Sequence, residues 1–187
     1  MEVGKSGKEL REASRFFKKT RPSIARGGRN RDGGELFFKM PSYTGNYRSV
    51  VDDKGRLAIP AKLRRNGGEK FFLSIGFNGY LVLYPESEWE DIGKNLSTQP
   101  FTFGAYRDFN RFLYATAQEV APDPQGRILI PEDYLKEAGI TGEAVVLGAA
   151  RWMEIWSPAR YKAFVARFKP KWEKVAEKIF SKNSKPT

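Results

Sequence analysis

Short apolar segments alternate with turn residues along the chain from residue 43 onward, a pattern that predicts paired strands and short helices. Strands are expected in two hairpins, Phe71–Ile75 with Tyr80–Tyr84 and Glu143–Leu147 with Met153–Trp156. The first hairpin turns at Asn78-Gly79, a dipeptide typical of tight connections between antiparallel strands.

Five helices are predicted, two from a proline at the start and glycine after the end, and the linker helix from apolar positions at helical spacing. They are Ala61–Arg65, Glu86–Leu96, a linker helix with aromatic residues from Phe103 to Leu113, Glu132–Ala138 and Ala159–Phe168. The aromatic stripe of the linker helix is interpreted as core or subunit contact. After the last helix, Pro170 should kink or stop the chain, because proline lacks the amide hydrogen that a helix needs. The aromatic residues among the lysines there are expected to pack on the fold or on a neighbouring subunit, with base stacking or a membrane surface as alternatives.

The chain contains an internal duplication. Asp52, Gly55, Arg56, Ile59 and Pro60 recur 71 residues later as Asp123, Gly126, Arg127, Ile130 and Pro131. Downstream the offset becomes 72, which aligns Trp89 with Tyr161. An ordered series of matches with one insertion indicates two copies of one unit of roughly 45 residues.

Each copy of the Asp-x-x-Gly-Arg motif predicts a tight turn, a short buried strand and a helix that starts at proline. Structural roles are therefore predicted for Asp52, Gly55, Pro60, Asp123, Gly126 and Pro131. A unit of this size is marginal by itself. Two copies that face each other are expected to bury the apolar surface that each would expose alone, and to form a pseudo-two-fold barrel.

These patterns predict a mainly β fold with short helices, of the α+β class. The expected segments are a basic and weakly ordered extension (1–42), a first repeat (45–92), a linker helix (93–116), a second repeat (117–162) and a lysine-rich helix and tail (163–187). Met40 stands just before the first structured segment, which suggests that translation starts there. No apolar run approaches the roughly 20 residues that cross a bilayer, so no membrane partner is expected.

Composition narrows the possible chemistry. The 187 residues contain no cysteine and no histidine, which excludes thiolate nucleophiles, histidine-based triads and histidine or cysteine metal sites. A carboxylate–magnesium site or a Ser–Lys pair survives this filter. The four acids between Glu86 and Asp91 lie in the first turns of a predicted helix, where they favour the helix dipole. No enzyme activity, cofactor, metal or small-molecule substrate is therefore expected.

The net charge of +11 comes from both ends of the chain. Residues 1–40 carry +6 and residues 158–187 carry +7, whereas residues 41–157 carry −2. Positive charge of this kind attracts polyanions. Solvated basic ends without a dedicated ligand are the competing interpretation.

The segment from Asp52 to Arg64 resembles the first DxxxR box of the MraZ proteins, and the segment from Asp123 to Pro131 resembles the second. The likeness extends over about residues 43 to 162 and includes Tyr43-Thr44-Gly45 at its start. It implies a double-split, swapped-hairpin β-barrel built from two SpoVT/AbrB-like repeats. It also implies a bacterial transcriptional regulator, mostly a repressor, that forms a ring-shaped homo-oligomer and binds direct repeats of double-stranded DNA in the promoter of the division and cell-wall gene cluster.

The two copies differ in charge, and this difference suggests different roles. The segment from Arg48 to Lys70 carries +4, whereas the segment from Pro122 to Thr141 carries −2. Because lysine and arginine neutralise phosphates, the first copy is expected to face DNA and the second to complete the barrel or a subunit contact.

The candidate DNA-binding residues lie mainly in the first copy. Arg56 or Arg64 is expected to contact bases or a groove, and Lys54, Lys62 and Arg65 the phosphate backbone. For Arg127, contact with DNA is implied by the family resemblance. The competing interpretation is structural, with each motif aspartate paired to the arginine of its own turn, and both interpretations can hold together.

The alternative function is a nonspecific nucleoid- or RNA-associated protein that binds through its basic ends. That hypothesis predicts loss of binding when residues 1–40 and 170–187 are deleted, whereas a regulator should lose it in Arg56→Ala. A single-unit, antitoxin-like repressor is disfavoured by the duplication. As a DNA-binding regulator the protein is expected in the cytoplasm, at the nucleoid.

Overall fold

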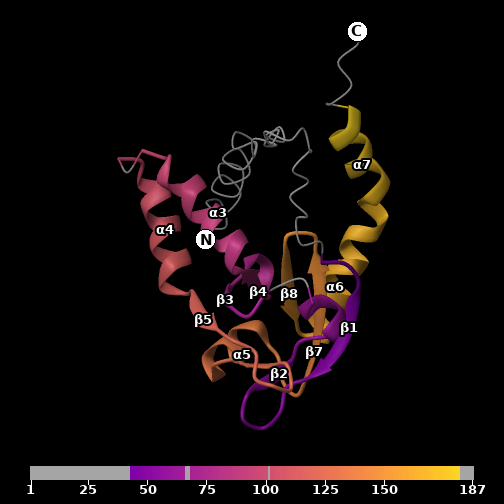
Figure 1. Ribbon diagram of the computed structural model, residues 1–187. Coiled ribbons are helices and arrows are strands. Elements are labelled where there is room, and N and C mark those ends of the chain that lie inside the picture. Colours follow the sequence, from indigo (N-terminus) through magenta and orange to yellow (C-terminus); the bar gives the residue numbers. More distant parts are fainter. Residues whose placement is uncertain (1–42, 66–67, 101, 182–187) are drawn as a thin grey trace, which may run out of the picture. The chain divides into compact units, whose positions relative to one another are not determined.

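A computed structural model describes residues 43–65, 68–100 and 102–181 of the chain (Figure 1). The described residues all belong to one compact unit within residues 40–187. The expected basic extension (1–42) and the expected start at Met40 lie outside the described residues.

The two copies of the repeat contain the same elements in the same order. The first copy and its linker comprise β1 (Asn46–Val50), β2 (Arg56–Ala58), α2 (Ala61–Arg64), β3 (Phe71–Ile75), the 3-10 turn η1 (Phe77–Gly79), β4 (Leu81–Pro85), α3 (Glu86–Ser97) and α4 (Gly104–Ala115). The second comprises β5 (Gln118–Val120), β6 (Arg127–Leu129), α5 (Glu132–Ala138), β7 (Glu143–Ala149), β8 (Trp152–Trp156) and α6 (Pro158–Phe168). The 3-10 turn η2 (Lys169–Lys171) and α7 (Trp172–Ser181) follow.

The predicted hairpins and helices are confirmed within two residues at each end. The first hairpin turns through Asn78 at φ 60°, so the predicted Asn-Gly turn is correct. Helix α5 ends at Gly139 in the left-handed conformation, at φ 64°. Pro170 lies in η2, which separates α6 from α7 as predicted. Strands β1 and β5 were not predicted.

The strands of the two copies interleave in one antiparallel sheet, in the order β1-β7-β8-β4-β3-β5. Strand β1 of the first copy pairs with β7 of the second, and β5 of the second copy pairs with β3 of the first. The two hairpins meet in the middle, where β4 pairs with β8. Each copy therefore supplies an edge strand to the other, and neither copy forms its share of the sheet alone.

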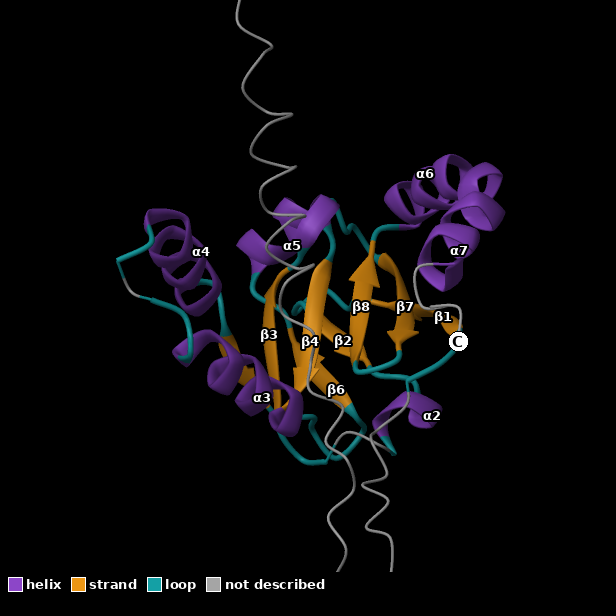
Figure 2. Ribbon diagram, turned by 90° about the horizontal axis from the view of Figure 1, so that it is seen from above, coloured by secondary structure: helices purple, strands orange, loops and turns teal. Residues whose placement is uncertain are grey.

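A second, two-stranded sheet joins the two motifs directly (Figure 2). Strands β2 and β6 run antiparallel, with Leu57 opposite Ile128 and both side chains fully buried. The backbone bonds beyond the strands are reciprocal between the copies. The amide of Ile59 donates to the carbonyl of Gly126, and the amide of Ile130 donates to the carbonyl of Gly55, each at 2.9 Å.

Each hairpin turn is also fastened to the other copy by an arginine. Arg151 in the β7–β8 turn donates to Glu88 on α3 at 2.5 Å and to Asp91 at 3.2 Å. Arg160 on α6 donates to the carbonyl of Gly79, in the first hairpin turn, at 2.7 Å. These bonds fix helices α3 and α6 against the central strand pair.

The described residues thus form a mixed α+β fold with two antiparallel sheets and two interleaved repeats. One core contains apolar side chains from both copies, among them Leu57, Leu73, Leu83, Ile128 and Ile155. Closure of the sheets into a barrel stays a prediction. Among the helices of the described residues, none has the length and apolar content needed to cross a lipid bilayer.

Candidate nucleic-acid interface

The two motif turns have the same geometry. One carboxylate oxygen of Asp52 accepts hydrogen bonds from the amides of Lys54, at 3.0 Å, and Arg56, at 2.8 Å. The corresponding oxygen of Asp123 accepts from the amides two and four residues later, at 3.0 and 2.9 Å. The aspartates therefore hold their turns as the sequence predicted.

The turn glycines are required for two reasons. Gly55 and Gly126 have φ values of 76° and 79°, in the left-handed region that favours glycine. A Cβ at Gly55 would also lie 2.8 Å from the carbonyl oxygen of Ile130, and one at Gly126 would collide with the guanidinium of Arg64. Pro60 and Pro131 immediately precede α2 and α5, which confirms the predicted helix starts.

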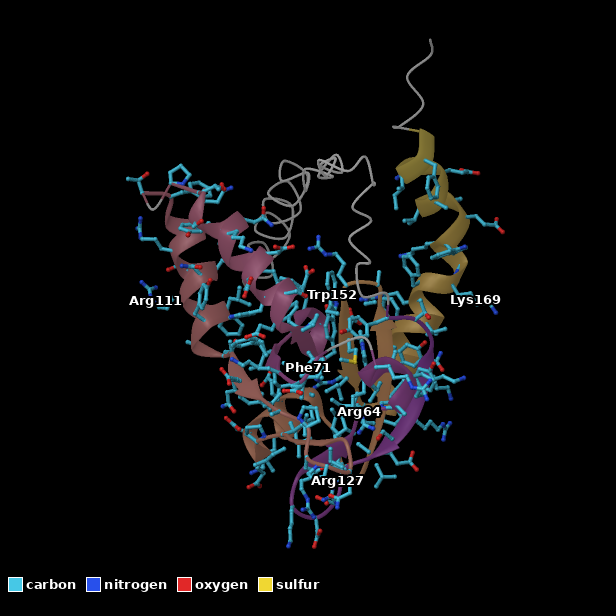
Figure 3. The ribbon with its side chains drawn as sticks, viewed as in Figure 1. Arg64, Phe71, Arg111, Arg127, Trp152 and Lys169 are labelled. Atoms are coloured by element: carbon cyan, nitrogen blue, oxygen red, sulfur yellow. The ribbon has the colours of Figure 1, made fainter. Side chains whose placement is uncertain are left out.

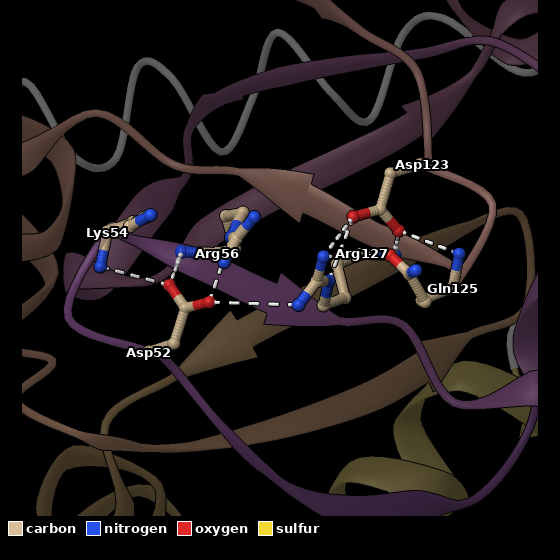
Figure 4. A network of polar contacts seen from close by, with 6 residues as sticks. All are labelled: Asp52, Lys54, Arg56, Asp123, Gln125 and Arg127. Atoms are coloured by element: carbon tan, nitrogen blue, oxygen red, sulfur yellow. Dashed lines mark hydrogen bonds and ion pairs between the residues drawn. The ribbon is translucent and has the colours of Figure 1, made fainter.

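The same aspartates hold the motif arginines (Figure 4). Nε of Arg56 donates to the second carboxylate oxygen of Asp52 at 2.8 Å, and Nε of Arg127 donates to that of Asp123, also at 2.8 Å. Nη2 of Arg127 further donates to the side-chain oxygen of Gln125 at 2.8 Å. Nη1 of Arg127 lies 3.9 Å from Asp52, so the two turns form one network.

These contacts lower the pKa of both aspartates. For Asp52 the main cause is the hydrogen bond from the Arg56 amide, with further bonds from the Arg56 guanidinium and the Lys54 amide. For Asp123 the main cause is the hydrogen bond from the Arg127 guanidinium, followed by the Arg127 amide. Both carboxylates stay ionised near neutral pH and can restrain the arginines electrostatically.

The β2–β6 ribbon presents both arginines on one face. Alternation along the strands buries Leu57 and Ile128 and turns Arg56 and Arg127 toward the opposite, accessible side. The two arginine side chains are 35% and 29% exposed. Leu129 lies directly opposite Arg56 on this face and is 59% exposed. We call the face formed by Arg56, Ala58, Arg127 and Leu129 the ribbon face.

The two arginines differ in how many guanidinium nitrogens remain available to bind a ligand. Within the part of the chain that the structure describes, Nε is the only guanidinium atom of Arg56 that makes a hydrogen bond. Arg127 uses both Nε and Nη2 in hydrogen bonds. Arg56 therefore offers two nitrogens to a ligand, and Arg127 offers one.

The remaining predicted DNA-binding residues differ in how they relate to this network. Arg64 is half-buried on α2, and its guanidinium covers Gly126 in the second turn (Figure 3). Lys54 is an exposed residue of the first turn. Lys62 and Arg65 are exposed at α2 and make no hydrogen bond or ion pair to the network among the described residues.

The structure adds residues that the sequence did not indicate. Gln125 restrains Arg127, and Leu129 supplies an apolar side chain beside Arg56. Gln125 acts within its own turn, two residues before Arg127, whereas only the cross-copy pairing of β2 and β6 reveals the place of Leu129. Among the described residues there is no group of three or more acidic side chains placed to hold a metal ion.

Comparison with known proteins agrees with the duplicated architecture. The family model for the MraZ proteins, described as antitoxin-like, matches residues 43–112 and again residues 113–184. A "Transcriptional regulator MraZ" of Heliobacterium modesticaldum is 39% identical over 137 residues, which cover 73% of this chain and 96% of the relative. Proteins of the same name from Pelotomaculum thermopropionicum (38% over 141 residues, 75% and 97% covered) and Moorella thermoacetica (37% over 137 residues, 73% and 96% covered) are similarly close.

Proposed function

The chain belongs to the MraZ family, a family of transcriptional regulators and not of enzymes, and we propose that it regulates transcription by binding promoter DNA through the ribbon face. Its targets are direct repeats ahead of the division and cell-wall gene cluster, and the expected effect is repression. The site of action is then the cytoplasm, at the nucleoid.

The β2–β6 ribbon is the observation that carries this proposal. A two-stranded antiparallel ribbon fits the major groove of B-form DNA, which is about 12 Å wide. This ribbon carries arginine on each strand of its accessible face, and its two buried residues attach it to the core. It is therefore a rigid element that presents cationic side chains at fixed positions.

Arg56 is the residue best suited to read a base. Its bond to Asp52 orients the guanidinium and leaves both terminal nitrogens for a ligand. Two such donors match the O6 and N7 acceptors of guanine, a pairing worth about 1–3 kcal/mol of discrimination. The aspartate reduces the entropy that the arginine would otherwise lose on binding. Pairing with aspartate and contact with DNA are thus compatible roles.

Arg127 supports a contribution from both copies. The charge difference along the sequence suggested that the second copy mainly completes the barrel or a subunit contact. Strand pairing instead lays Arg127 beside Arg56, so we propose that it contacts the same groove through Nη1. Lys54, Lys62, Arg64 and Arg65 then position the protein on the phosphates, without sequence information of their own.

We further propose that the two sheets close as a pseudo-two-fold, double-split barrel and that chains assemble into a ring. The bridge between Val51 and Leu57 and the bond from Ser49 to the carbonyl of Ala58, at 2.7 Å, connect the ribbon to strand β1 and support closure. A ring supports the reading of repeats, because several weak contacts then act at high effective concentration.

Binding of promoter DNA and of scrambled DNA at several salt concentrations tests the proposal. Wild type should prefer the promoter, Arg56→Ala should lose that preference, and the matched control Arg167→Ala on α6 should retain it. Equal binding of both DNAs by wild type and Arg56→Ala would instead support a nonspecific nucleic-acid-binding protein that uses its basic ends.

A further inference from the structure

In each copy a helix lies beside the corresponding inner strand, α3 beside β3 and α6 beside β7, and in the first copy a further helix, α4, covers the space beside them. Helix α3 lies beside β3, and Tyr114 of α4 packs edge-on against Trp89 of α3 with ring centroids 5.4 Å apart. Its hydroxyl would be 3.3 Å from a Cβ at Gly93. Thr116, which follows α4, contacts Ser74 of β3 at 3.0 Å. An aromatic side chain therefore fills the first site.

The corresponding site of the second copy is an open groove between β1, β7 and α6. Tyr161 and Val165 occupy the positions equivalent to Trp89 and Gly93, 72 residues later. The groove has a volume of about 490 Å³. Its lining includes Tyr47, Val145, Tyr161 and Val165, with Arg48 and Lys162 at its rim. No described residue takes the place that Tyr114 has in the first copy.

The outer face of α4 has the complementary properties. Phe112, on the side of the helix opposite Tyr114, is 57% exposed. Asp108, four residues before Phe112 and thus on the same face, has an exposed carboxylate whose only ion-pair partner among the described residues is the equally exposed Arg111. An exposed pair of this kind contributes little and rearranges readily.

Helix α4 lies on the opposite flank of the described fold from β1, β7 and α6, the elements that line the groove, as Figure 1 and Figure 2 both show. A chain cannot place its own α4 in its own groove. The occupant that fits is a second copy, whose aromatic residue meets an apolar floor and whose aspartate meets a basic rim.

We propose that Phe112 of one chain inserts into the β1–β7–α6 groove of the next, with Asp108 facing Arg48 and Lys162. This contact uses two different surfaces, so it repeats from head to tail and closes as a ring if the rotation permits. The inference rests on the proposed self-assembly and identifies the surfaces that carry it. An aromatic residue buried in a pocket is the usual centre of such an interface.

Sedimentation velocity of the full chain, with variants on each surface, tests the inference. Phe112→Glu removes the inserted side chain, and Val165→Glu blocks the groove with a charge that repels Asp108. Each should raise the dissociation constant by about thirtyfold or more and yield monomers of 21.3 kDa. Ile179→Glu, at a similarly exposed apolar position on α7 (55%), should leave the assembly unchanged. Circular dichroism should match wild type in every variant.

Mixing the two monomeric variants gives the sharper result. Phe112→Glu keeps an intact groove and Val165→Glu keeps an intact α4 face, so one productive contact forms per pair and the chains should stop at heterodimers. If wild type is a monomer, both the ring proposal and this inference fail. If wild type assembles and both variants assemble equally well, or if Ile179→Glu alone dissolves the assembly, the ring stands and these surfaces are wrong.

Discussion

Three glycines with nearly the same backbone conformation allow the motif turns to be tested quantitatively. Gly55, Gly126 and Gly142 have φ values of 76°, 79° and 75°, but a Cβ would meet different surroundings at each. It would meet nothing within 4 Å at Gly142, the mobile end of Arg64 at Gly126 and the backbone oxygen of Ile130 at Gly55. Substitution by alanine therefore has the same conformational cost at all three positions, whereas the contacts of the added methyl group differ.

The expected losses in unfolding free energy follow from these surroundings. An alanine in the left-handed region costs about 1–2 kcal/mol, which is the whole effect expected for Gly142→Ala. Gly126→Ala should lie close to that value, because a flexible side chain can move away. Gly55→Ala should lose about 1–3 kcal/mol more, because the crowded atom is backbone of the other copy and cannot yield without disturbing the ribbon.

Urea denaturation at one fixed protein concentration, followed by tryptophan fluorescence, measures the three variants on a common scale. Gly126→Ala should also weaken DNA binding relative to Gly142→Ala, because the added methyl group displaces Arg64. Equal destabilisation of all three variants, or the largest loss at Gly142, would refute the account of the turns.

Two further predictions concern charged groups. Replacing Arg151 by methionine leaves the buried carboxylate of Glu88 without its cation and should cost about 2–4 kcal/mol in urea denaturation, whereas Arg111→Met, at an exposed pair, should cost less than about 0.5 kcal/mol. A similar loss in both would contradict the proposed fastening of α3. Because the pKa of Asp123 is lowered in the folded state, its contribution to stability is complete above the ordinary carboxyl pKa and is lost as the pH falls through the folded-state value. The difference in unfolding free energy between wild type and Asp123→Asn should therefore shrink below about pH 4, and a difference that stays constant down to pH 2 would argue against the network.

Local elements could be predicted from the sequence because their signals are local. The Asn-Gly turn, the prolines before α2 and α5 and the left-handed Gly139 each act within a few residues. Strand β1 was missed because only its partner in the other copy makes it a strand, and its alternate residues remain exposed. The exchange of edge strands depends on pairing over about 100 residues for β1 with β7 and about 50 residues for β3 with β5, which no local pattern reports.

The sequence predicted which arginines belong to the candidate site but not how they are arranged in space. The duplicated motif identified Arg56 and Arg127, whereas the charge of the two copies suggested separate roles for them. Cross-copy pairing of β2 and β6 brings both arginines to one face, an arrangement that the charge along the sequence did not indicate. Glu88 lies in the first turn of α3 as predicted, and the structure adds that it is buried against Arg151. Glu88 and Arg151 are 63 positions apart in the sequence, so no local pattern indicates their contact.

Base reading by the guanidinium of Arg56 is the central step of the proposed function. Arg56→Lys keeps the charge but removes the two-donor edge, so it separates base contact from phosphate contact. We expect this variant to lose about tenfold or more of the promoter preference while the salt dependence of binding stays the same. Retention of the full promoter preference by Arg56→Lys would show that the ribbon face does not read bases through Arg56.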